Sequence, residues 1–327
     1  MTHHLRVLLR VLAVGALVAV AHPAAGQPAY PVKPVRFIVP YAAGSSLDVQ
    51  ARLYAPRLAE GLGQQVFIDN RGGGNTVIGS EALLRAPPDG HTIMIVAATH
   101  VIVPSLLAKV PYDPIRDFAP VANLTRNELA LVAHPALPVR TLREFIALAK
   151  SKPGQLNFGS PGTGTATHLA IELFNITAGI QMQHVPYNGA GPLTIDLLGG
   201  HIATSLQAPI TIIPHINSGR LRALGITGTA RLPALPQVST FAEGGLPGFA
   251  AKVWFGVLAP AATPKAVIDR LQAEFSKFLL LPEFREKLTA QGVEPFFLDP
   301  EQFGALIKTD FEMWAKVIKT ANIKADN

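Results

Sequence analysis

Residues 156–172 read LNFGSPGTGTATHLAIE, and this stretch decides the fold. It starts like the end of a buried strand, breaks into a Gly/Ser/Pro/Thr turn over 159–164, and enters an apolar helical pattern at Thr165. The first residues of a helix leave N–H groups without partners and carry a partial positive charge, which suits an anion such as a carboxylate. An ordinary turn with a Ser or Thr N-cap explains the same residues, and the stretch alone favours that interpretation.

The N-terminal hundred residues repeat the same order of elements. Strands are expected at 35–40, 65–69 and 92–97, and helices at 47–62 and 77–85. This alternation predicts a parallel sheet with helices on its faces. The loops 41–46 and 71–76 then lie at the carboxyl ends of strands, where open α/β sheets bind ligands. Ser45 or Ser46 is a natural N-cap, and Asp48 either balances the helix dipole or contacts a ligand.

The pattern restarts at Leu129 and continues to the end of the chain. Strands are expected at 129–133, 156–159, 183–187, 202–206, 223–227 and 254–259. Helices are expected at 141–151, 190–198 and 210–218, and later helices near 265–281, 283–291 and 300–320. These are more α/β units than one compact sheet accommodates. We therefore expect domain 1 to comprise 28–124 plus 249–327 and domain 2 to comprise 125–248. Two chain crossings would form a hinge, with a ligand cleft between the domains.

The N-terminal segment 1–26 has the features of a signal peptide. Arg6 and Arg10 give a positive n-region, residues 7–21 are almost wholly apolar, and small residues follow at 24–26. A membrane anchor is the alternative, but the apolar run is short for a span. Removal of this segment lowers the formal charge from +6 to +4. With this mild charge and no basic block interleaved with aromatic residues, nucleic acid is not expected as a partner.

An enzyme is the rival class of protein. Ser160, His168 and Asp196 could form a catalytic triad, but the nucleophile-elbow pattern requires Gly at position 158, where Phe158 stands. The sequence contains no HExxH motif and no cysteine, so neither a metal nor another cofactor is expected. His168, as a lone histidine near a helix start, more often packs or caps than catalyses. We therefore expect a binding protein and no enzyme.

Motifs along the whole mature chain resemble those of one known family. They are PVKPVRFIVP at 31–40, GSSLD at 44–48, PDGHT at 88–92, GSPGTG at 159–164, VPYNGAGP at 185–192, DLLGG at 196–200 and WFG at 254–256. In this order they are similar to the Bug-family extracytoplasmic solute receptors, the substrate-binding components of tripartite tricarboxylate transporters.

The resemblance implies a fold, a location and partners. The fold would be an α/β, two-domain periplasmic-binding-protein fold of the Venus-flytrap type (type II), with the ligand cleft between the domains. The protein would be a periplasmic monomer that captures a small carboxylate, often a dicarboxylate or an aromatic acid, for membrane permease subunits. A receptor that reports the ligand to a membrane signalling protein is the alternative, and the sequence does not separate the two roles.

The resemblance also implies which residues hold the ligand. One carboxylate would lie between the loops 41–46 and 160–165, partly held through water. Tyr187 and Trp254 either line the cleft or belong to the core. Neutral Gln207 stands where the family commonly places an acid, which argues against an amino-acid ligand. The expected ligand-binding residues are Tyr41, Ala43, Ser45, Ser46, Asp48, Asn75, Thr76, Ser160, Gly162, Thr163, Gly164, Thr165, His168, Tyr187, Gln207, Ala208 and Trp254.

Overall fold

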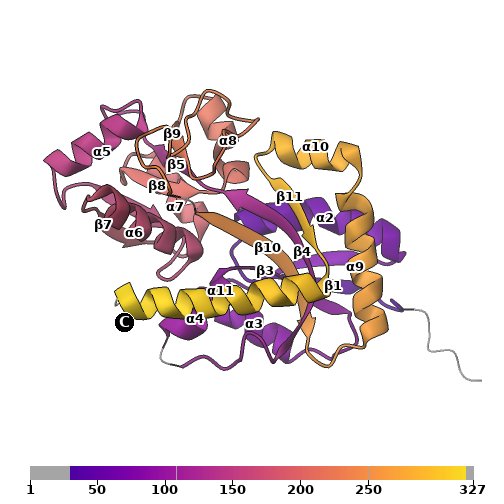
Figure 1. The fold of residues 1–327 in the computed structure, drawn as a ribbon. Coiled ribbons are helices and arrows are strands. Elements are labelled where there is room, and N and C mark those ends of the chain that lie inside the picture. The colour runs from indigo at the N-terminus through magenta and orange to yellow at the C-terminus, as the bar shows by residue number, and fades with distance from the viewer. Residues whose placement is uncertain (1–29, 108, 250, 322–327) are drawn as a thin grey trace, which may run out of the picture. The chain divides into compact units, whose positions relative to one another are not determined.

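Two β-sheets with covering helices make up the chain from Lys33 onward, which forms one compact unit in a computed structural model (Figure 1). The structure describes residues 30–107, 109–249 and 251–321, so the expected signal peptide lies outside the described residues. Within these ranges, no helix is both long enough and apolar enough to cross a bilayer.

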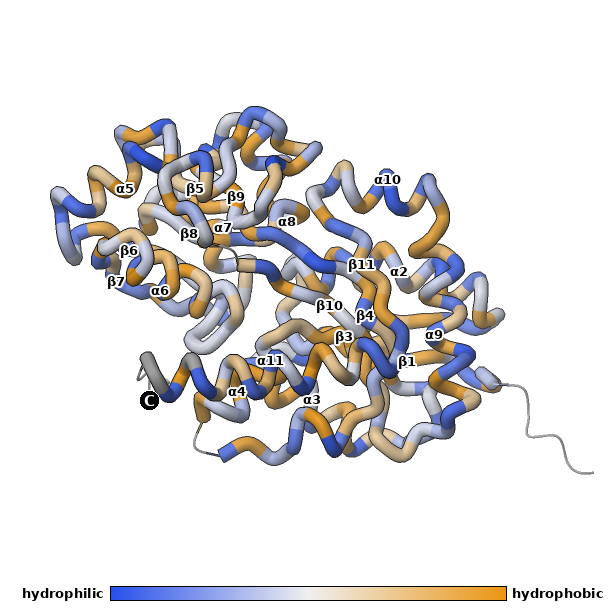
Figure 2. The backbone as a smooth tube through the Cα atoms, viewed as in Figure 1, coloured by the Kyte–Doolittle hydropathy of each residue, from blue (hydrophilic) through white to orange (hydrophobic). Residues whose placement is uncertain are grey.

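The first sheet has six strands in the order β11-β4-β10-β3-β1-β2. Their bounds are β1 (Val35–Val39), β2 (Val66–Asn70), β3 (Thr92–Ala97), β4 (Phe118–Glu128), β10 (Lys252–Pro260) and β11 (Glu294–Leu298). Strands β1, β2 and β3 pair in parallel, which confirms the expected parallel arrangement of the N-terminal units. All six residues of β3 are buried, as is typical of a strand covered on both faces, and hydrophobic residues dominate it (Figure 2).

The second sheet has five strands in the order β7-β6-β8-β5-β9. Their bounds are β5 (Ala130–Ala133), β6 (Asn157–Ser160), β7 (Gln183–Pro186), β8 (Thr204–Gln207) and β9 (Arg222–Ile226). Strand β6 pairs in parallel with β7 and β8, while β5 is antiparallel to β8 and β9. We call the residues around each sheet the six-stranded lobe and the five-stranded lobe.

Helices follow most strands. The six-stranded lobe carries α2 (Ser46–Leu62), α3 (Val77–Leu84), α4 (Thr99–Leu106), α9 (Lys265–Leu279), α10 (Pro282–Ala290) and α11 (Pro300–Ala321). The five-stranded lobe carries α5 (Leu142–Ser151), α6 (Ala166–Ala178), α7 (Ala190–Leu198) and α8 (Pro209–Asn217). The C-terminal helices α9 and α11 contact β4, so the end of the chain packs on the six-stranded sheet.

The chain passes between the lobes at two places. Leu129 separates β4 from β5, and the segment from Thr227 to Ala251 returns to β10. Thr227 joins both passages: its Oγ1 accepts a 2.8 Å hydrogen bond from Leu129 N and donates one of 2.6 Å to Ala251 O. The expected boundary between 124 and 125 falls inside β4, which runs on to Glu128. The division into two domains at the expected residues stays a prediction.

Candidate functional site

A cleft lies between the two lobes, and residues from both lobes line it. Its polar lining comes from Tyr41, Ser45, Ser46, Thr99, Asn127, Thr165, Thr167, Gln207 and Thr211. Its apolar lining comes from Leu47, Ala97, Leu129, Pro161, Ala166, Ala190, Leu193, Leu206, Ala208, Val253 and Phe255. Among the described lining residues, none carries a charged side chain.

Five helices begin at this cleft. The first residues of α2, α4, α6 and α7 and the N-cap of α8 line it, namely Ser46, Thr99, Ala166, Ala190 and Ala208. Each helix start presents N–H groups without intrahelical partners and about half a unit of positive charge. The cleft therefore has a positive potential although no cationic side chain lines it. Such a site favours a small anion that accepts several hydrogen bonds.

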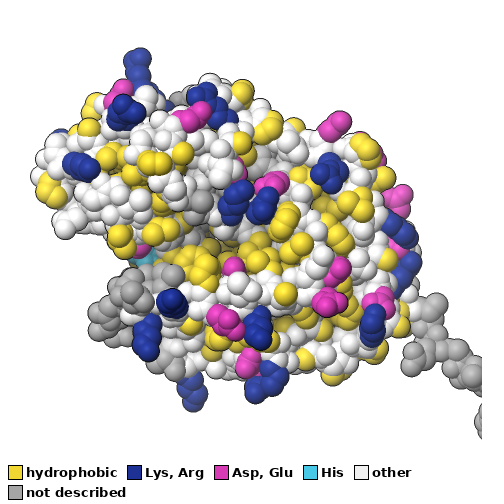
Figure 3. Space-filling model, viewed as in Figure 1, with side chains coloured by type: hydrophobic (Ala, Val, Ile, Leu, Met, Phe, Trp, Pro, Cys, Tyr) yellow, Lys and Arg dark blue, Asp and Glu magenta, His cyan; other side chains and the backbone are white. Residues whose placement is uncertain are grey.

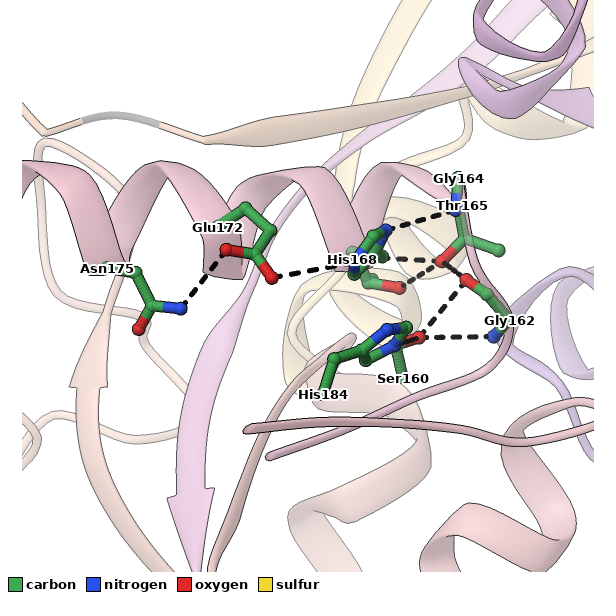
Figure 4. Close-up of polar contacts among 9 residues, drawn as sticks. Ser160, Gly162, Gly164, Thr165, His168, Glu172, Asn175 and His184 are labelled. Carbon is green, nitrogen blue, oxygen red and sulfur yellow. Dashed lines mark hydrogen bonds and ion pairs between the residues drawn. The ribbon is translucent and has the colours of Figure 1, made fainter. Parts of the chain in front are cut away.

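The loop before α6 is held by hydrogen bonds among its own residues and the start of the helix (Figure 4). Thr165 is the N-cap of α6: its Oγ1 accepts a 3.3 Å bond from His168 N and donates a 2.8 Å bond to Gly162 O. Ser160 Oγ lies 2.7 Å from His184 Nε2 and accepts a 3.3 Å bond from Gly162 N. These contacts fix the loop so that Thr165 reaches the cleft while Ser160 stays buried beneath it.

His168 supports this loop from behind. Its Nδ1 accepts a 3.0 Å hydrogen bond from Gly164 N, and its Nε2 lies 3.6 Å from Glu172 Oε1. Its ring stacks on His184 with centroids 4.0 Å apart. Burial works to raise the pKa of Glu172, but hydrogen bonds with His168 and Asn175 outweigh it and keep this pKa below its usual range. His168 is therefore a residue that positions the loop, and it does not line the cleft.

Asp48 supports the loop of the other lobe in a similar way. Asp48 is 2% exposed, and its carboxylate accepts hydrogen bonds from Gly44 N (2.9 Å), Arg52 Nε (2.9 Å) and Asn70 Nδ2 (3.0 Å). Burial works to raise the pKa of Asp48, yet these bonds outweigh it and hold this pKa below its usual range. Ser45 is the N-cap of α2 and accepts a 3.3 Å bond from Asp48 N. All of these contacts keep the carboxylate of Asp48 inside the loop.

Thr99 and Tyr41 meet at the base of the cleft. Thr99 Oγ1 accepts a 3.3 Å hydrogen bond from Ala166 N, so the start of α4 in one lobe contacts the start of α6 in the other. Burial raises the pKa of Tyr41 to about 12, and its hydrogen bond with Thr99 offsets this rise only in part. The Tyr41 hydroxyl is therefore neutral near pH 7 and can donate to a ligand.

The expected site residues fall into three groups. Six line the cleft: Tyr41, Ser45, Ser46, Thr165, Gln207 and Ala208. Asn75, Thr76, Gly162, Thr163 and Tyr187 line an adjacent depression, which Tyr41 and Thr165 also border. Ala43, Asp48, Ser160, Gly164, His168 and Trp254 line neither of these two. The second and third groups include residues that hold the loops rather than face the cleft.

Trp254 was expected to bind the ligand, but it does not line the cleft. Side chains alternate between the faces of a strand, so Val253 and Phe255 face the cleft and Trp254 faces away. Its Nε1 donates a 2.5 Å hydrogen bond to Asp310 Oδ2 on α11, and its ring packs against Phe303. It lines a separate groove between α6 and α11, where hydrophobic side chains surround a hollow in Figure 3.

Several residues of the cleft were not expected from the sequence. Thr99 lies on α4 and Asn127 on β4, two elements that the sequence pattern did not indicate. Phe255 could have been found, because it follows Trp254 in an expected strand and must face the opposite side. Thr167 lies within the stretch that decides the fold, two residues after the N-cap of α6.

A cleft between two mixed α/β sheets, with helix starts pointing into it, defines a two-domain periplasmic binding protein of the type II fold. Residues 50–323 match the family described as the tripartite tricarboxylate transporter family receptor, and the chain belongs to this family. Protein BugT of Bordetella pertussis is 36% identical over 322 residues, which cover 97% of this chain and 99% of BugT. The family resemblance inferred from the sequence is therefore confirmed.

Solved structures agree with this assignment. The structure of R. palustris Rpa4515 with adipate has a TM-score of 0.87 and 32% identity, and covers 91% of this chain and 100% of that chain. MatC from Rhodopseudomonas palustris with bound malate has a TM-score of 0.81 and 31% identity, and covers 88% of this chain and 100% of that chain. Members of this family are periplasmic binding receptors, which confirms the expectation that the chain is not an enzyme.

Proposed function

We propose that this receptor captures a small organic carboxylate in the cleft between its lobes. The observation that carries the proposal is the convergence of five helix starts on a cleft whose described lining has no charged side chain. N–H groups and hydroxyls there can share the hydrogen bonds of one carboxylate group, and the apolar lining suits a carbon chain. The adipate and malate bound to Rpa4515 and MatC support the same class of ligand.

The proposed contacts come from both lobes. Ser45, Ser46 and the N–H groups at the start of α2 would bind one side of the carboxylate, and the remaining N–H groups at the start of α6, beyond the N-cap Thr165, would bind the other. Tyr41 would donate through its hydroxyl. Asn75 and Thr163 border the adjacent depression and would contact the ligand only through water or after movement of the loops.

A thermal-shift screen of the mature protein tests the proposal. Mono-, di- and tricarboxylates, aromatic acids, amino acids and neutral sugars are added at equal concentration. Because a ligand that binds the native state raises its melting temperature, at least one organic acid should produce a shift that grows with its concentration. Shifts by neutral sugars alone would refute carboxylate binding. Turnover of a bound ester would instead revive the hydrolase alternative.

We also propose the biological setting. Segment 1–26 would direct export and be removed, and N-terminal sequencing of the exported protein tests this directly. The ligand-bound receptor would deliver its cargo to the small and large membrane subunits of a tripartite tricarboxylate transporter. Uptake of the ligand by cells that lack either the receptor or the permease tests this partnership: loss in both strains is expected. Uptake that persists in both would favour a signalling receptor.

A further inference from the structure

Two buried amide side chains in the cleft each have one atom that bonds to no described residue. Asn127 on β4 is 1% exposed, and its Oδ1 has no hydrogen-bond partner in the described part of the chain. Gln207 at the end of β8 is 4% exposed, and its Nε2 likewise has none there. Both residues line the cleft. A buried polar atom without a partner is costly, so these two atoms indicate which hydrogen-bonding groups a ligand can supply.

A chain of hydrogen bonds sets the orientation of the Asn127 amide. Thr125 Oγ1 donates a 2.9 Å bond to Gln50 Oε1, which uses its single hydrogen. Thr125 Oγ1 can then only accept from Asn127, whose Nδ2 lies 3.5 Å away. In this arrangement the amide nitrogen of Asn127 faces Thr125 Oγ1, and Oδ1 is the atom left as an acceptor for the cleft.

The Gln207 amide has the opposite orientation. Its Oε1 accepts a 3.3 Å hydrogen bond from Thr194 Oγ1 on α7, which leaves Nε2 as a donor. The cleft therefore offers one buried acceptor and one buried donor in addition to the donors at its helix starts. A plain saturated diacid can accept from Gln207 but has nothing to donate to Asn127 Oδ1.

We propose that the ligand is a hydroxy acid, whose hydroxyl donates to Asn127 Oδ1 while another of its oxygens accepts from Gln207 Nε2. This inference rests on the proposed function and narrows it. An ammonium group could also donate to Asn127, but no Asp or Glu is among the described residues that line the cleft. The helix starts make the potential there positive, which disfavours a cation. A hydroxyl supplies the missing donor without a charge.

Calorimetric titration with matched acids tests the inference. Succinate, malate and aspartate share one carbon skeleton and carry hydrogen, hydroxyl and ammonium at the same carbon. Glutarate with 2- and 3-hydroxyglutarate, and butyrate with 3-hydroxybutyrate, extend the comparison to other lengths. In the series that binds best, a hydroxylated acid should bind at least about tenfold more tightly than the plain acid. This ratio corresponds to a difference of about 1.4 kcal/mol in binding free energy. The amino analogue should bind more weakly than the hydroxylated one.

The outcomes separate this inference from the proposed function. If acids bind but the plain member is as tight as every hydroxylated partner, or the amino analogue is the tightest, the inference falls and carboxylate capture stands. If no acid binds, both fall. These ratios are measured on the unaltered protein, so they do not depend on whether a variant folds.

Two variants then assign the preference to one residue. Asn127→Leu should reduce the ratio between hydroxylated and plain acid to about one. Asn123→Leu is the matched control, because Asn123 lies on the same strand and is buried but bonds Phe296 O and does not line the cleft. It should keep the ratio of the unaltered protein. A ratio that survives Asn127→Leu would contradict the assignment.

Discussion

Thr99 Oγ1 accepts a 3.3 Å hydrogen bond from Ala166 N, and these two residues are the first residues of helices in different lobes. The bond uses one of the N–H groups that the start of α6 would otherwise leave without a partner. Because Thr99 and Ala166 both line the cleft, the bond joins the two lobes at the cleft itself. We therefore expect a ligand held between the lobes to bind more tightly when this contact is made.

Replacement of Thr99 tests this dependence. Thr99→Val keeps the shape of the side chain but removes the hydroxyl that bonds Ala166 N and Tyr41. We expect carboxylate affinity, measured by calorimetry, to fall by about 0.5–1.5 kcal/mol, the usual net value of one hydrogen bond. Thr309→Val on the exposed surface of α11 is the control and should leave affinity unchanged. Equal affinity for both variants would show that the contact between lobes is irrelevant to binding.

A side chain at Gly164 should lower the stability of the fold. It has φ of +79°, and a Cβ at this residue would lie 2.1 Å from Leu106 Cδ2. Gly154 has a similar φ of +72° but open space around it, so Gly154→Ala measures the backbone strain alone, about 1–2 kcal/mol. We expect Gly164→Ala to lower the free energy of unfolding in urea by more than Gly154→Ala does. Adding Leu106→Ala should recover the excess, and equal losses for both glycines would refute the clash.

The depressed pKa of Asp48 predicts that the stability of the fold depends on pH. The pKa of the Asp48 carboxyl is lower in the folded protein than in the unfolded chain. Its hydrogen bonds therefore stabilise the fold fully at pH values above the pKa of the unfolded chain. This stabilisation is lost as the pH falls through the depressed folded value. Asp48→Asn should therefore reduce the free energy of unfolding at pH 7 by about 1–3 kcal/mol.

Urea titrations at a series of pH values check the sign of this effect. The difference between the unaltered protein and Asp48→Asn should shrink steadily below about pH 4. Asp269→Asn, at a half-exposed carboxylate on α9, is the control and should show a much smaller difference at pH 7. A difference that widens toward low pH would contradict the role of Asp48.

Trp254 should matter for stability and not for binding. Trp254→Phe removes the hydrogen bond that Trp254 donates to the carboxyl of Asp310. Burial raises the pKa of Asp310, and this hydrogen bond offsets the rise only in part. We expect the free energy of unfolding to fall by roughly 1–3 kcal/mol because Asp310 loses a buried partner. Carboxylate affinity should stay within about twofold, since Trp254 faces away from the cleft. Phe255→Ala, by contrast, should weaken binding because Phe255 lines the cleft.

The sequence predicted the regular elements well where one physical signal dominated. Strand β3, TIMIVA, is apolar from Ile93 to Ala97, and its expected bounds of 92–97 agree with the structure. Helix α7 likewise begins and ends where its pattern indicated, at 190 and 198. The turn before α6 was located because glycines, a proline and an N-cap punctuate the chain there.

Strand β4 shows where such signals fail. It contains Pro120 and the polar residues Asn123, Thr125, Arg126 and Asn127, so it has neither an apolar run nor a clear alternation. Its polar side chains are stabilised by partners distant in sequence, such as Phe296 O for Asn123 and Glu294 for Arg126. Because the strand was not foreseen, the contribution of Asn127 to the cleft was not foreseen either. Asp48 and His168 were expected to bind the ligand, and only tertiary contacts show that their side chains hold the loops from within.

The central claim is that helix starts in a cleft without charged lining residues hold a carboxylate. Calorimetric titration with the acid that gives the largest thermal shift, and with the same molecule whose carboxylates are converted to amides, tests it most directly. The two have nearly the same shape, and only the acid carries negative charge. We predict that the acid binds and that the amide binds at least about a hundredfold more weakly, a difference of about 2.7 kcal/mol. Equal binding of acid and amide would contradict the account.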